Sequence, residues 1–525
     1  MELLAGYGVP PWGALTLVLL SLLYWYGTST FNTFKKLGIP YRPVYIPFLG
    51  HYYDLLTKTW TDIDAKLAKQ FPNKVYGTFQ GRQPILQTSD AEFSKEVLIK
   101  KFSSFMNRQV KVDEDSMIGN NMALIRDDHW KHIRVTLSPT FSSGKLKQMY
   151  PVICQCADKF VRRLELTDAK PTVINHLAAG YTMDAIARIA FGLDTNIQED
   201  PDHLFLVYSK TFFGFPLNNR ITTKIKFYIR IACLLLCSRK MKEFLNRFFD
   251  VYFPGSEITD YFYGLMTSVL SETTEELQKR KDFISMCSDK MVDLDKVDKD
   301  SIKVTDGKRW TTQGLTKGDI IANATIFLAA GYESVSGALN YFFYIMSLKP
   351  DIQDKLYSLI TEVADENGEC SYEDLKKLEY LDWCIDETMR MFPAVSRLDR
   401  VASSDVVVKG VTIPKGMVVE ILVHSMHHDP DYWVEPETFN PDRFAPENKT
   451  EIQQYAFAPF GLGGRKCIAT SLALLEVKVA IIKAMVAFRF EKCNDTPELE
   501  DVKFQPGMIL LKTTAPLNIP AVPRK

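Results

Sequence analysis

One cysteine of the chain lies in a glycine-rich, positively charged stretch, FGLGGRKCIA, which runs from Phe460 to Ala469. Glycine lets a backbone approach a ligand closely and adopt positive φ. An apolar stretch at residues 471–490 predicts a long helix after Cys467, so the sulfur is expected near a helix N-terminus. Free N–H groups and the helix dipole favour a thiolate there. Such a thiolate serves either as a nucleophile or as a metal ligand.

The residues around the cysteine bear on this choice. A nucleophile needs a base within hydrogen-bonding reach, but the stretch next to Cys467 offers cations and no histidine. Haem iron is one metal that takes a single axial thiolate from a protein. A haem also brings two propionates, which call for nearby cations, and Arg465 is placed for that role.

The loop supplies every specified position of the pattern F-x-x-G-x-R-x-C-x-[GA], through Phe460, Gly463, Arg465, Cys467 and Ala469. It therefore resembles the haem-binding loop of the cytochrome P-450 monooxygenases, where glycine is more usual than Ala469. The resemblance implies that Cys467 is the axial thiolate of a haem b, and that Phe460, Gly463 and Arg465 help to hold the cofactor. It covers essentially the whole chain. It is closest to the microsomal branch that holds family-3 drug- and steroid-oxidising enzymes and thromboxane synthase.

A second motif upstream predicts a structural ion cluster. Glu387 and Arg390 in CIDETMRMFP are three residues apart, so their side chains share a helical face and can pair. The later stretch FNPDRF contains Arg443. The resemblance implies that Arg443 joins Glu387 and Arg390 in a Glu–Arg–Arg cluster. A buried, bidentate network of this kind locks a fold without taking part in chemistry.

A long apolar stretch at residues 320–345 predicts a helix that contains Ala330, Gly331, Glu333 and Ser334. Glycine in a helix interior costs roughly 1 kcal/mol relative to alanine, so we interpret the two small residues as leaving room for a ligand. The stretch resembles the family's oxygen-binding motif A-G-x-[DE]-T, whose acid and hydroxyl organise water for proton delivery. Serine lacks the methyl group that restricts χ1 of threonine. We therefore expect looser proton delivery and more uncoupling.

Further cations are expected around the cofactor. Trp130 and Arg134 are four residues apart on one helical face. They resemble the family's W-x-x-x-R motif, in which both side chains hold haem propionates. By similar alignment, Arg108 and Arg400 are further propionate partners. A basic face that steers an acidic, flavin-containing reductase is a separate expectation, built from Lys131, Lys145, Lys147 and Lys466.

The N-terminus predicts a membrane anchor. Residues 10–27 are strongly apolar, and no charged residue occurs between Glu2 and Lys35. A span needs about 20 apolar residues, and Lys35 and Lys36 after the stretch place the rest of the chain in the cytosol by the positive-inside rule. A buried core helix is the alternative.

This anchor divides the chain into residues 1–30, a transmembrane helix, and residues 31–525, a haem-containing catalytic domain. We expect a single-pass protein of the endoplasmic reticulum membrane with a cytosolic catalytic domain. A second apolar stretch with cations, residues 221–237, is either a helix in the membrane interface or an ordinary core helix.

The bulk composition agrees with a large folded protein. Of 525 residues 46% are hydrophobic, and the net charge of −1 argues against a nucleic-acid-binding protein. Nine cysteines without a C-x-x-C pair indicate a reduced, cytosol-facing compartment. Helical periodicity dominates from about 90 to 349, and short strand patterns occur at 74–89 and 405–422. We predict a mainly α (α+β) protein with a large helical body and small sheets, as in the P-450 fold.

The resemblance implies a monooxygenase that inserts one oxygen atom from O2 into a lipophilic steroid, fatty acid or xenobiotic. NADPH supplies the electrons through NADPH-cytochrome P-450 reductase, with cytochrome b5 as a second candidate partner. One alternative is a haem-thiolate isomerase that rearranges a lipid peroxide without O2 or reductase, and another is a non-catalytic haem sensor. The presence of Glu333 and Ser334 favours the monooxygenase. The substrate pocket is expected around residues 105–125, 205–240 and 394–400, but its ligand is not specified by the sequence.

Overall fold

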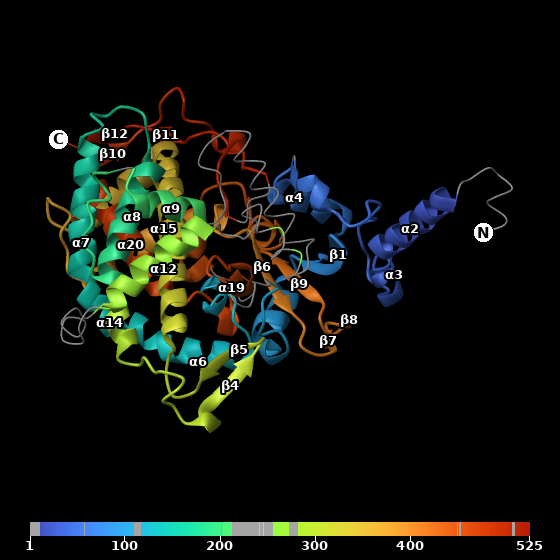
Figure 1. The fold of residues 1–525 in the computed structure, drawn as a ribbon. Helices are drawn as coiled ribbons and strands as arrows, with labels where there is room; N and C mark the ends of the chain where they lie inside the picture. Colours follow the sequence, from blue (N-terminus) through green and yellow to red (C-terminus); the bar gives the residue numbers. More distant parts are fainter. Residues whose placement is uncertain are drawn as a thin grey trace.

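The structure, a computed structural model, consists of a broad helical body with the largest sheet on one side (Figure 1). The N-terminal helix α2 (Pro11–Thr28) projects away from this body on the same side as the sheet. The structure describes residues 11–56, 58–109, 117–200, 202–212, 241, 245, 256–271, 282–448, 450, 453–506 and 510–524. The predicted helical body with small sheets is therefore confirmed.

The helices account for most of the described chain. The long helices of the body are α7 (Ser143–Glu165), α8 (Ile174–Phe191), α15 (Lys317–Leu348) and α20 (Thr470–Ala487). The other helices are α3 (Thr33–Leu37), α4 (Trp60–Gln70), α5 (Ala91–Lys95), α6 (Asp127–Leu137), α9 (Leu204–Phe212), α12 (Ser256–Leu270), α14 (Phe283–Ser288), α16 (Pro350–Thr361), α17 (Glu379–Met391), α18 (Val423–His427) and α19 (Gln453–Ala456).

The largest sheet has four strands in the order β1-β2-β9-β6, with β2 and β9 parallel and the other pairs antiparallel. Its strands are β1 (Val75–Gln80), β2 (Gln83–Thr88), β6 (Arg397–Val401) and β9 (Val418–Leu422). Four two-stranded sheets pair β3 (Thr172–Val173) with β11 (Asn518–Ile519), β4 (Ile302–Thr305) with β5 (Lys308–Thr311), β7 (Val406–Val408) with β8 (Val411–Ile413), and β10 (Phe488–Phe490) with β12 (Ala521–Pro523). Strands thus occur in both regions where the sequence pattern predicts them.

Helix α15 runs through the middle of the helical body beside α8 (Figure 1). It begins with a capping box, in which the Asp319 N–H donates to Thr316 Oγ1 at 3.1 Å and the Thr316 N–H donates to Asp319 Oδ2 at 3.0 Å. Reciprocal bonds of this kind satisfy N–H groups that a helix start leaves unpaired. Residues of α7, α8, α15 and α20 form one large buried cluster, which holds α15 in place.

One predicted boundary was wrong. The sequence pattern extends the last long helix over residues 471–490, but α20 ends at Ala487 and β10 follows. Phe488 and Phe490 are buried whereas Arg489 between them is more exposed, which is the alternation of a strand that pairs with β12. The final apolar residues therefore belong to a sheet because a distant segment supplies their partner.

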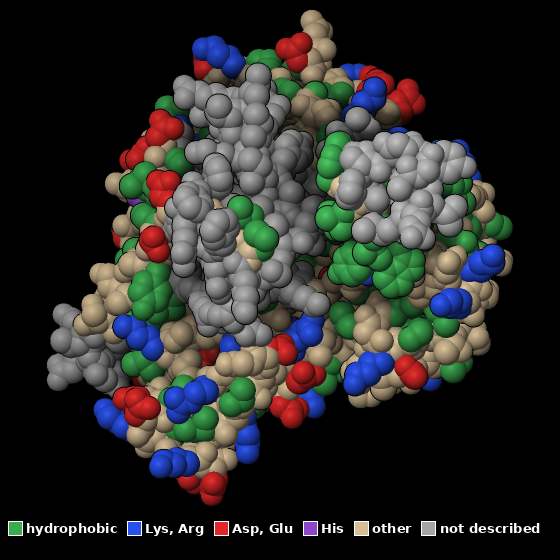
Figure 2. Space-filling model, turned by 45° about the vertical axis from the view of Figure 1, so that its right-hand side comes forward, with side chains coloured by type: hydrophobic (Ala, Val, Ile, Leu, Met, Phe, Trp, Pro, Cys, Tyr) green, Lys and Arg blue, Asp and Glu red, His purple; other side chains and the backbone are tan. Residues whose placement is uncertain are grey.

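Helix α2 carries an unusually exposed apolar surface. Trp12, Leu15, Tyr24 and Trp25 each have more than 60% of their surface exposed, and hydrophobic side chains gather at the projecting lobe in Figure 2. Within the described part of the chain, no helix has both the length and the apolar character required to cross a membrane.

Some predictions fall outside the described residues. The amphipathic stretch 221–237 lies there, and so do 110–116 and 213–240 of the expected substrate pocket.

Candidate functional site

Cys467 lies between a short helical turn, Gly463–Arg465, and the start of α20 at Thr470. Its thiol is exposed. The Cys467 N–H donates to the Phe460 carbonyl at 2.9 Å, and Thr470 Oγ1 donates to the Cys467 carbonyl at 3.0 Å. The backbone of Cys467 is thus held from both sides, which leaves the sulfur accessible just before a helix N-terminus.

The glycines of the loop pack it against residues 98–102. Gly463 has a φ of 71°, and a Cβ at this position would lie 1.8 Å from the Leu98 carbonyl oxygen. A Cβ at Gly464 would lie 2.7 Å from the Phe102 ring. The turn therefore requires glycine for a close approach between two segments as well as for its left-handed conformation.

Arg465 has a different set of partners from the one expected. The sequence suggests that it faces a propionate, but its guanidinium donates to three backbone carbonyls at 2.8–2.9 Å, those of Met106, Met122 and Ile125. It also lies over the Trp130 ring, 4.1 Å from the centroid. Arg465 therefore ties the cysteine loop to the segments before α6, and its charge acts from a fixed position.

Three further arginines surround Arg465. Burial, followed by the positive charges of Arg108 and Arg400, lowers the pKa of Arg465 to about 8. Burial and the charge of Arg108 also lower the pKa of Arg400 to about 9. Asp399 is the acid that opposes both shifts, and Arg134 adds a further positive charge near Arg465. This arginine cluster has an excess of positive charge.

One donor of the cluster lacks a hydrogen-bond acceptor. Arg400 is 1% exposed, and its Nη1 donates to the Asp399 carbonyl at 2.6 Å, but its Nε has no partner among the described residues. A buried cation with an unpaired donor is costly. Arg134 lies within reach of the Cys467 loop, because its Nη1 donates to the Lys466 carbonyl at 2.9 Å. An exposed thiol beside an arginine cluster with an excess of positive charge and an unpaired donor fits an iron porphyrin with two carboxylates.

The middle of α15 presents an accessible face. Ala330 is exposed although its helix runs through the core, and Phe327 and Ser334, one turn to either side, are partly exposed. Ser334 Oγ donates to the Ala330 carbonyl at 2.9 Å. Glu333 is buried, and its Oε1 lies 2.6 Å from Lys512 Nζ. The acid and the hydroxyl of the predicted proton route therefore both have partners within the protein.

Gly331 has another role than the one expected. A Cβ at Gly331 would lie 2.6 Å from Ile186 Cδ1 of α8. The glycine therefore lets α8 approach α15 and does not make room for a ligand. The small residue on the accessible face is Ala330.

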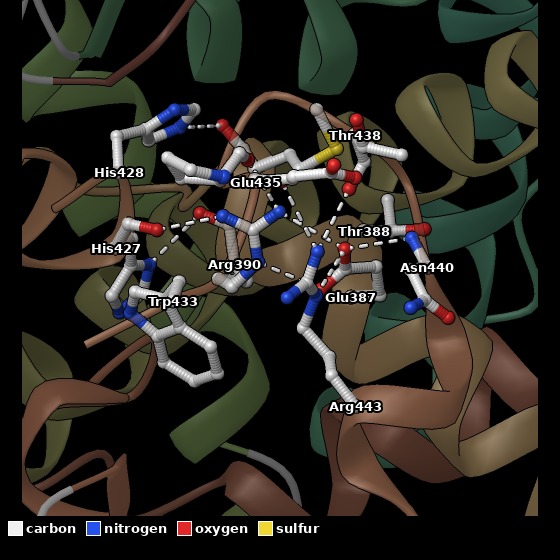
Figure 3. A network of polar contacts seen from close by, with 12 residues as sticks. Glu387, Thr388, Arg390, His427, His428, Trp433, Glu435, Thr438, Asn440 and Arg443 are labelled. Atoms are coloured by element: carbon white, nitrogen blue, oxygen red, sulfur yellow. Dashed lines mark hydrogen bonds and ion pairs between the residues drawn. The ribbon is translucent and has the colours of Figure 1, made fainter. Parts of the chain in front are cut away.

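Glu387, Arg390 and Arg443 form a buried network at the end of α17 (Figure 3). Arg390 Nε and Nη2 donate to the two Glu387 oxygens at 2.7 and 3.0 Å, and Arg443 Nε donates to Glu387 Oε1 at 3.0 Å. The remaining guanidinium groups donate to backbone carbonyls, those of His427, Val434, Glu435, Pro436 and Thr438. Every charge in this network is met by partners.

Sequence reasoning missed several members of this network. The Asn440 N–H donates to Glu387 Oε1 at 2.9 Å. His427 is fully buried, and its Nδ1 lies 3.0 Å from the Arg390 carbonyl while its Nε2 accepts the Ala458 N–H. Every residue has a backbone carbonyl, so residue types do not show which carbonyl will accept a hydrogen bond. Only the position of Asn440 inside the FNPDRF stretch hinted at its part in the network.

The predicted basic face is partly neutralised. Lys131 pairs with Asp128 at 3.1 Å, and Lys147 pairs with Glu373 at 2.5 Å. Lys466, directly before the cysteine, is exposed. Two of the four lysines therefore have an acidic neighbour on the surface.

The sequence model of the family "Cytochrome P450" matches residues 40–519. The chain belongs to this family. Cytochrome P450 3A7 of Homo sapiens is 35% identical over 528 residues, which cover 100% of this chain and 99% of the relative. Cytochrome P450 3A9 of Rattus norvegicus is 34% identical over 500 residues, and Cytochrome P450 3A5 of Homo sapiens is 33% identical over 503, each covering 94% of both chains. These relatives agree with the predicted family-3 branch.

As a cytochrome P450, the protein is a monooxygenase that uses a haem with a thiolate ligand and electrons from NADPH supplied through a reductase. When bound, the haem supplies the redox chemistry that splits O2 and transfers one oxygen atom to a substrate. The comparisons give no support to the isomerase alternative.

Proposed function

We propose that Cys467 is the axial ligand of a haem b and that the protein inserts one oxygen atom into a lipophilic steroid, fatty acid or xenobiotic. One observation carries the assignment of the site. The exposed thiol of Cys467 lies beside a buried arginine cluster whose positive charge is not balanced by the described residues. The family membership supplies the reaction type.

In this proposal each side chain of the site has a task. Arg400 and Arg108 bind the propionates directly. Arg400 Nε has no partner among the described residues, which supports its part in this assignment. Trp130 and Arg134 contribute from α6, and Arg465 adds positive charge while it fixes the loop. Phe460 accepts the Cys467 N–H through its carbonyl, and Gly463 allows the turn.

On the opposite side, Ala330 leaves space above the cofactor, and Glu333 and Ser334 carry protons toward the reacting oxygen. Ser334 lies on the accessible face of α15 and Glu333 lies at its edge, which supports this assignment. Glu387, Arg390 and Arg443 hold the fold and do not touch the substrate.

For the cellular setting we propose a catalytic domain of residues 31–525 on the cytosolic face of the endoplasmic reticulum membrane, attached through residues 1–30. The exposed apolar side chains of α2 support membrane attachment. Lys466 and Lys145 then belong to the surface that meets NADPH-cytochrome P-450 reductase, with cytochrome b5 as a second partner.

The ferrous–CO spectrum of the purified protein tests the ligand. We expect the long-wavelength Soret band of thiolate ligation in the natural chain and its loss in Cys467→Ser. Cys493→Ser is the matched control, since that thiol lies near the surface in the C-terminal segment. An unchanged spectrum in Cys467→Ser contradicts the assignment.

Turnover tests the reaction. Product from a lipophilic substrate is expected with O2, NADPH and reductase, and none when the reductase is left out. Product formed only from a lipid hydroperoxide contradicts the proposal.

A further inference from the structure

The acid of the proposed proton route is tied to a distant part of the chain. Glu333 Oε1 lies 2.6 Å from Lys512 Nζ, and the side chains of Glu333 and Lys512 are 8% and 26% exposed. Lys512 belongs to the C-terminal segment 510–524, far from α15 in sequence. A charge pair at this distance, largely removed from solvent, restricts both side chains more than a pair on an open surface.

The backbone around Lys512 is anchored next to α15. The Lys512 carbonyl accepts the Gln505 N–H at 2.8 Å. The Leu511 carbonyl accepts the hydroxyl of Tyr341, a residue of α15, at 2.9 Å, and the Leu511 N–H donates to the Ala394 carbonyl at 3.3 Å. The lysine therefore reaches Glu333 from a fixed base.

The pair lies at the edge of the accessible face of α15. Successive residues of a helix are rotated by about 100° around its axis. Glu333 therefore lies to one side of the line that joins Ala330 and Ser334 on the helix surface. The Ser334 hydroxyl already donates to the backbone of its own helix. Of the two groups in the proposed route, only Glu333 is positioned by a side chain from another part of the chain.

Other ionisable groups face the same pair. Burial lowers the pKa of Lys210 in α9. The nearby Glu333 carboxylate opposes this shift, and the charge of Lys512 adds to it. Burial, followed by the charge of Glu333, raises the pKa of Tyr332 and Tyr341 of α15, and the Tyr332 side chain also hydrogen-bonds to Glu333. Lys512 forms an ion pair with Glu333.

We infer that Lys512 is a positioning residue for oxygen transfer, whose ion pair holds the Glu333 carboxylate beside Ser334 on the proton route. This inference rests on the proposed function, because it gives Glu333 a part in proton delivery. Proton transfer requires groups held within hydrogen-bonding reach. Without Lys512 the carboxylate loses the ion pair that restricts it from outside α15, and reducing equivalents are lost as hydrogen peroxide.

The experiment compares Lys512→Met and Lys512→Arg in the full-length holoprotein with NADPH and reductase. We expect Lys512→Met to lower the product formed per NADPH consumed at least threefold, to raise hydrogen peroxide release and to change the solvent deuterium isotope effect on product formation. Lys512→Arg keeps the pair and is expected to retain most of the coupling. Haem content and the ferrous–CO spectrum serve to show that the site is intact.

Lys503→Met is the matched control, since Lys503 is exposed and its backbone carbonyl accepts the Thr514 N–H of the segment that contains Lys512. Glu333→Gln and the double variant Glu333→Gln/Lys512→Met complete the set, and the double variant is expected to be no worse than Glu333→Gln alone. Natural coupling in Lys512→Met, or additive losses in the double variant, overturns the inference. Failure of the proposed function is distinguishable, because the natural chain then lacks both the thiolate spectrum and reductase-dependent turnover.

Discussion

Two groups of buried arginines differ in whether the protein satisfies them. Around Glu387, the guanidinium groups of Arg390 and Arg443 donate to a shared carboxylate and to backbone carbonyls. Around Cys467, the arginine cluster has Asp399 as its opposing acid, and Arg400 Nε has no partner among the described residues. The residue types are alike, but the first group is complete and the second is not.

This difference agrees with the proposal that the first group is a structural network and the second a ligand site. Burial of a charge is tolerated when partners satisfy it, and removal of one partner is then strongly destabilising. A buried charge without partners lowers stability until an anion binds. Substitutions in the two groups are therefore expected to act on different quantities, which are stability in the first group and cofactor affinity in the second.

The largest effect is expected for Glu387→Gln. The substitution removes the charge between two buried guanidinium groups and should lower the free energy of unfolding by about 3–5 kcal/mol. Thermal and urea unfolding measure the change. The surface acid Glu373, which pairs with Lys147, supplies a control in Glu373→Gln with an unchanged midpoint. A stable Glu387→Gln protein would show that the network is dispensable.

A comparable loss of stability is expected for Arg465→Met, because this arginine of the Cys467 cluster also donates to backbone carbonyls, as the arginines around Glu387 do. Three carbonyl oxygens would lose their donor, and unsatisfied buried groups cost about 1–3 kcal/mol each. We expect lower stability together with weaker haem retention. Arg489→Met, on an exposed pair with Asp354, is the control. Loss of haem without loss of stability would place Arg465 wholly in the second group.

The complete network should also respond to acid. Burial lowers the pKa of His427 to about 3, whereas an unfolded histidine titrates near 6.5. Between these values the unfolded chain binds the additional proton, so stability falls as the pH decreases, by about 1.4 kcal/mol per pH unit at the steepest. Unfolding from pH 7 to 4 should show a smaller slope in His427→Gln and the natural slope in His203→Gln. Equal slopes in all three proteins would contradict this assignment.

The smallest effect, and the most discriminating, is expected for Arg400→Met. Removing a buried cation whose Nε has no partner among the described residues, and which lies near other arginines, should stabilise the haem-free protein by about 1 kcal/mol. The same change should weaken haem binding severalfold, because a propionate loses its donor. Unfolding of the haem-free protein and haem transfer to apomyoglobin measure the two quantities. A decrease in both would make the arginine cluster structural, like the Glu387 network.

Local patterns in the sequence predicted the parts of the site that depend on one element. Glu387 and Arg390 meet because a helix places residues three apart on one face, and they do pair. The glycine turn before Cys467 follows from the need for a left-handed backbone at Gly463. The helical body and the two strand regions were predicted because periodicity is a local property.

Local patterns could not predict hydrogen-bond and packing partners that come from distant segments of the chain. The sequence predicted that Arg465 lies near a cofactor. Its three carbonyl acceptors come from segments before α6, and backbone carbonyls cannot be told apart by residue type. Gly331 looked like space for a ligand, whereas the packing of α8 decides its role. The Phe488–Phe490 stretch continued the apolar pattern of α20 but joined a strand near the C-terminus.

The sequence by itself determined the family, the ligand candidate Cys467 and the local turns and helices, because each depends on residue types at fixed spacing. Only the tertiary structure decided which buried charges are satisfied and which are left for a ligand, and that Lys512 reaches Glu333. The physical reason is that satisfaction of a charge depends on all the atoms packed around it. Those atoms come from segments whose order along the chain says little about their distance in space.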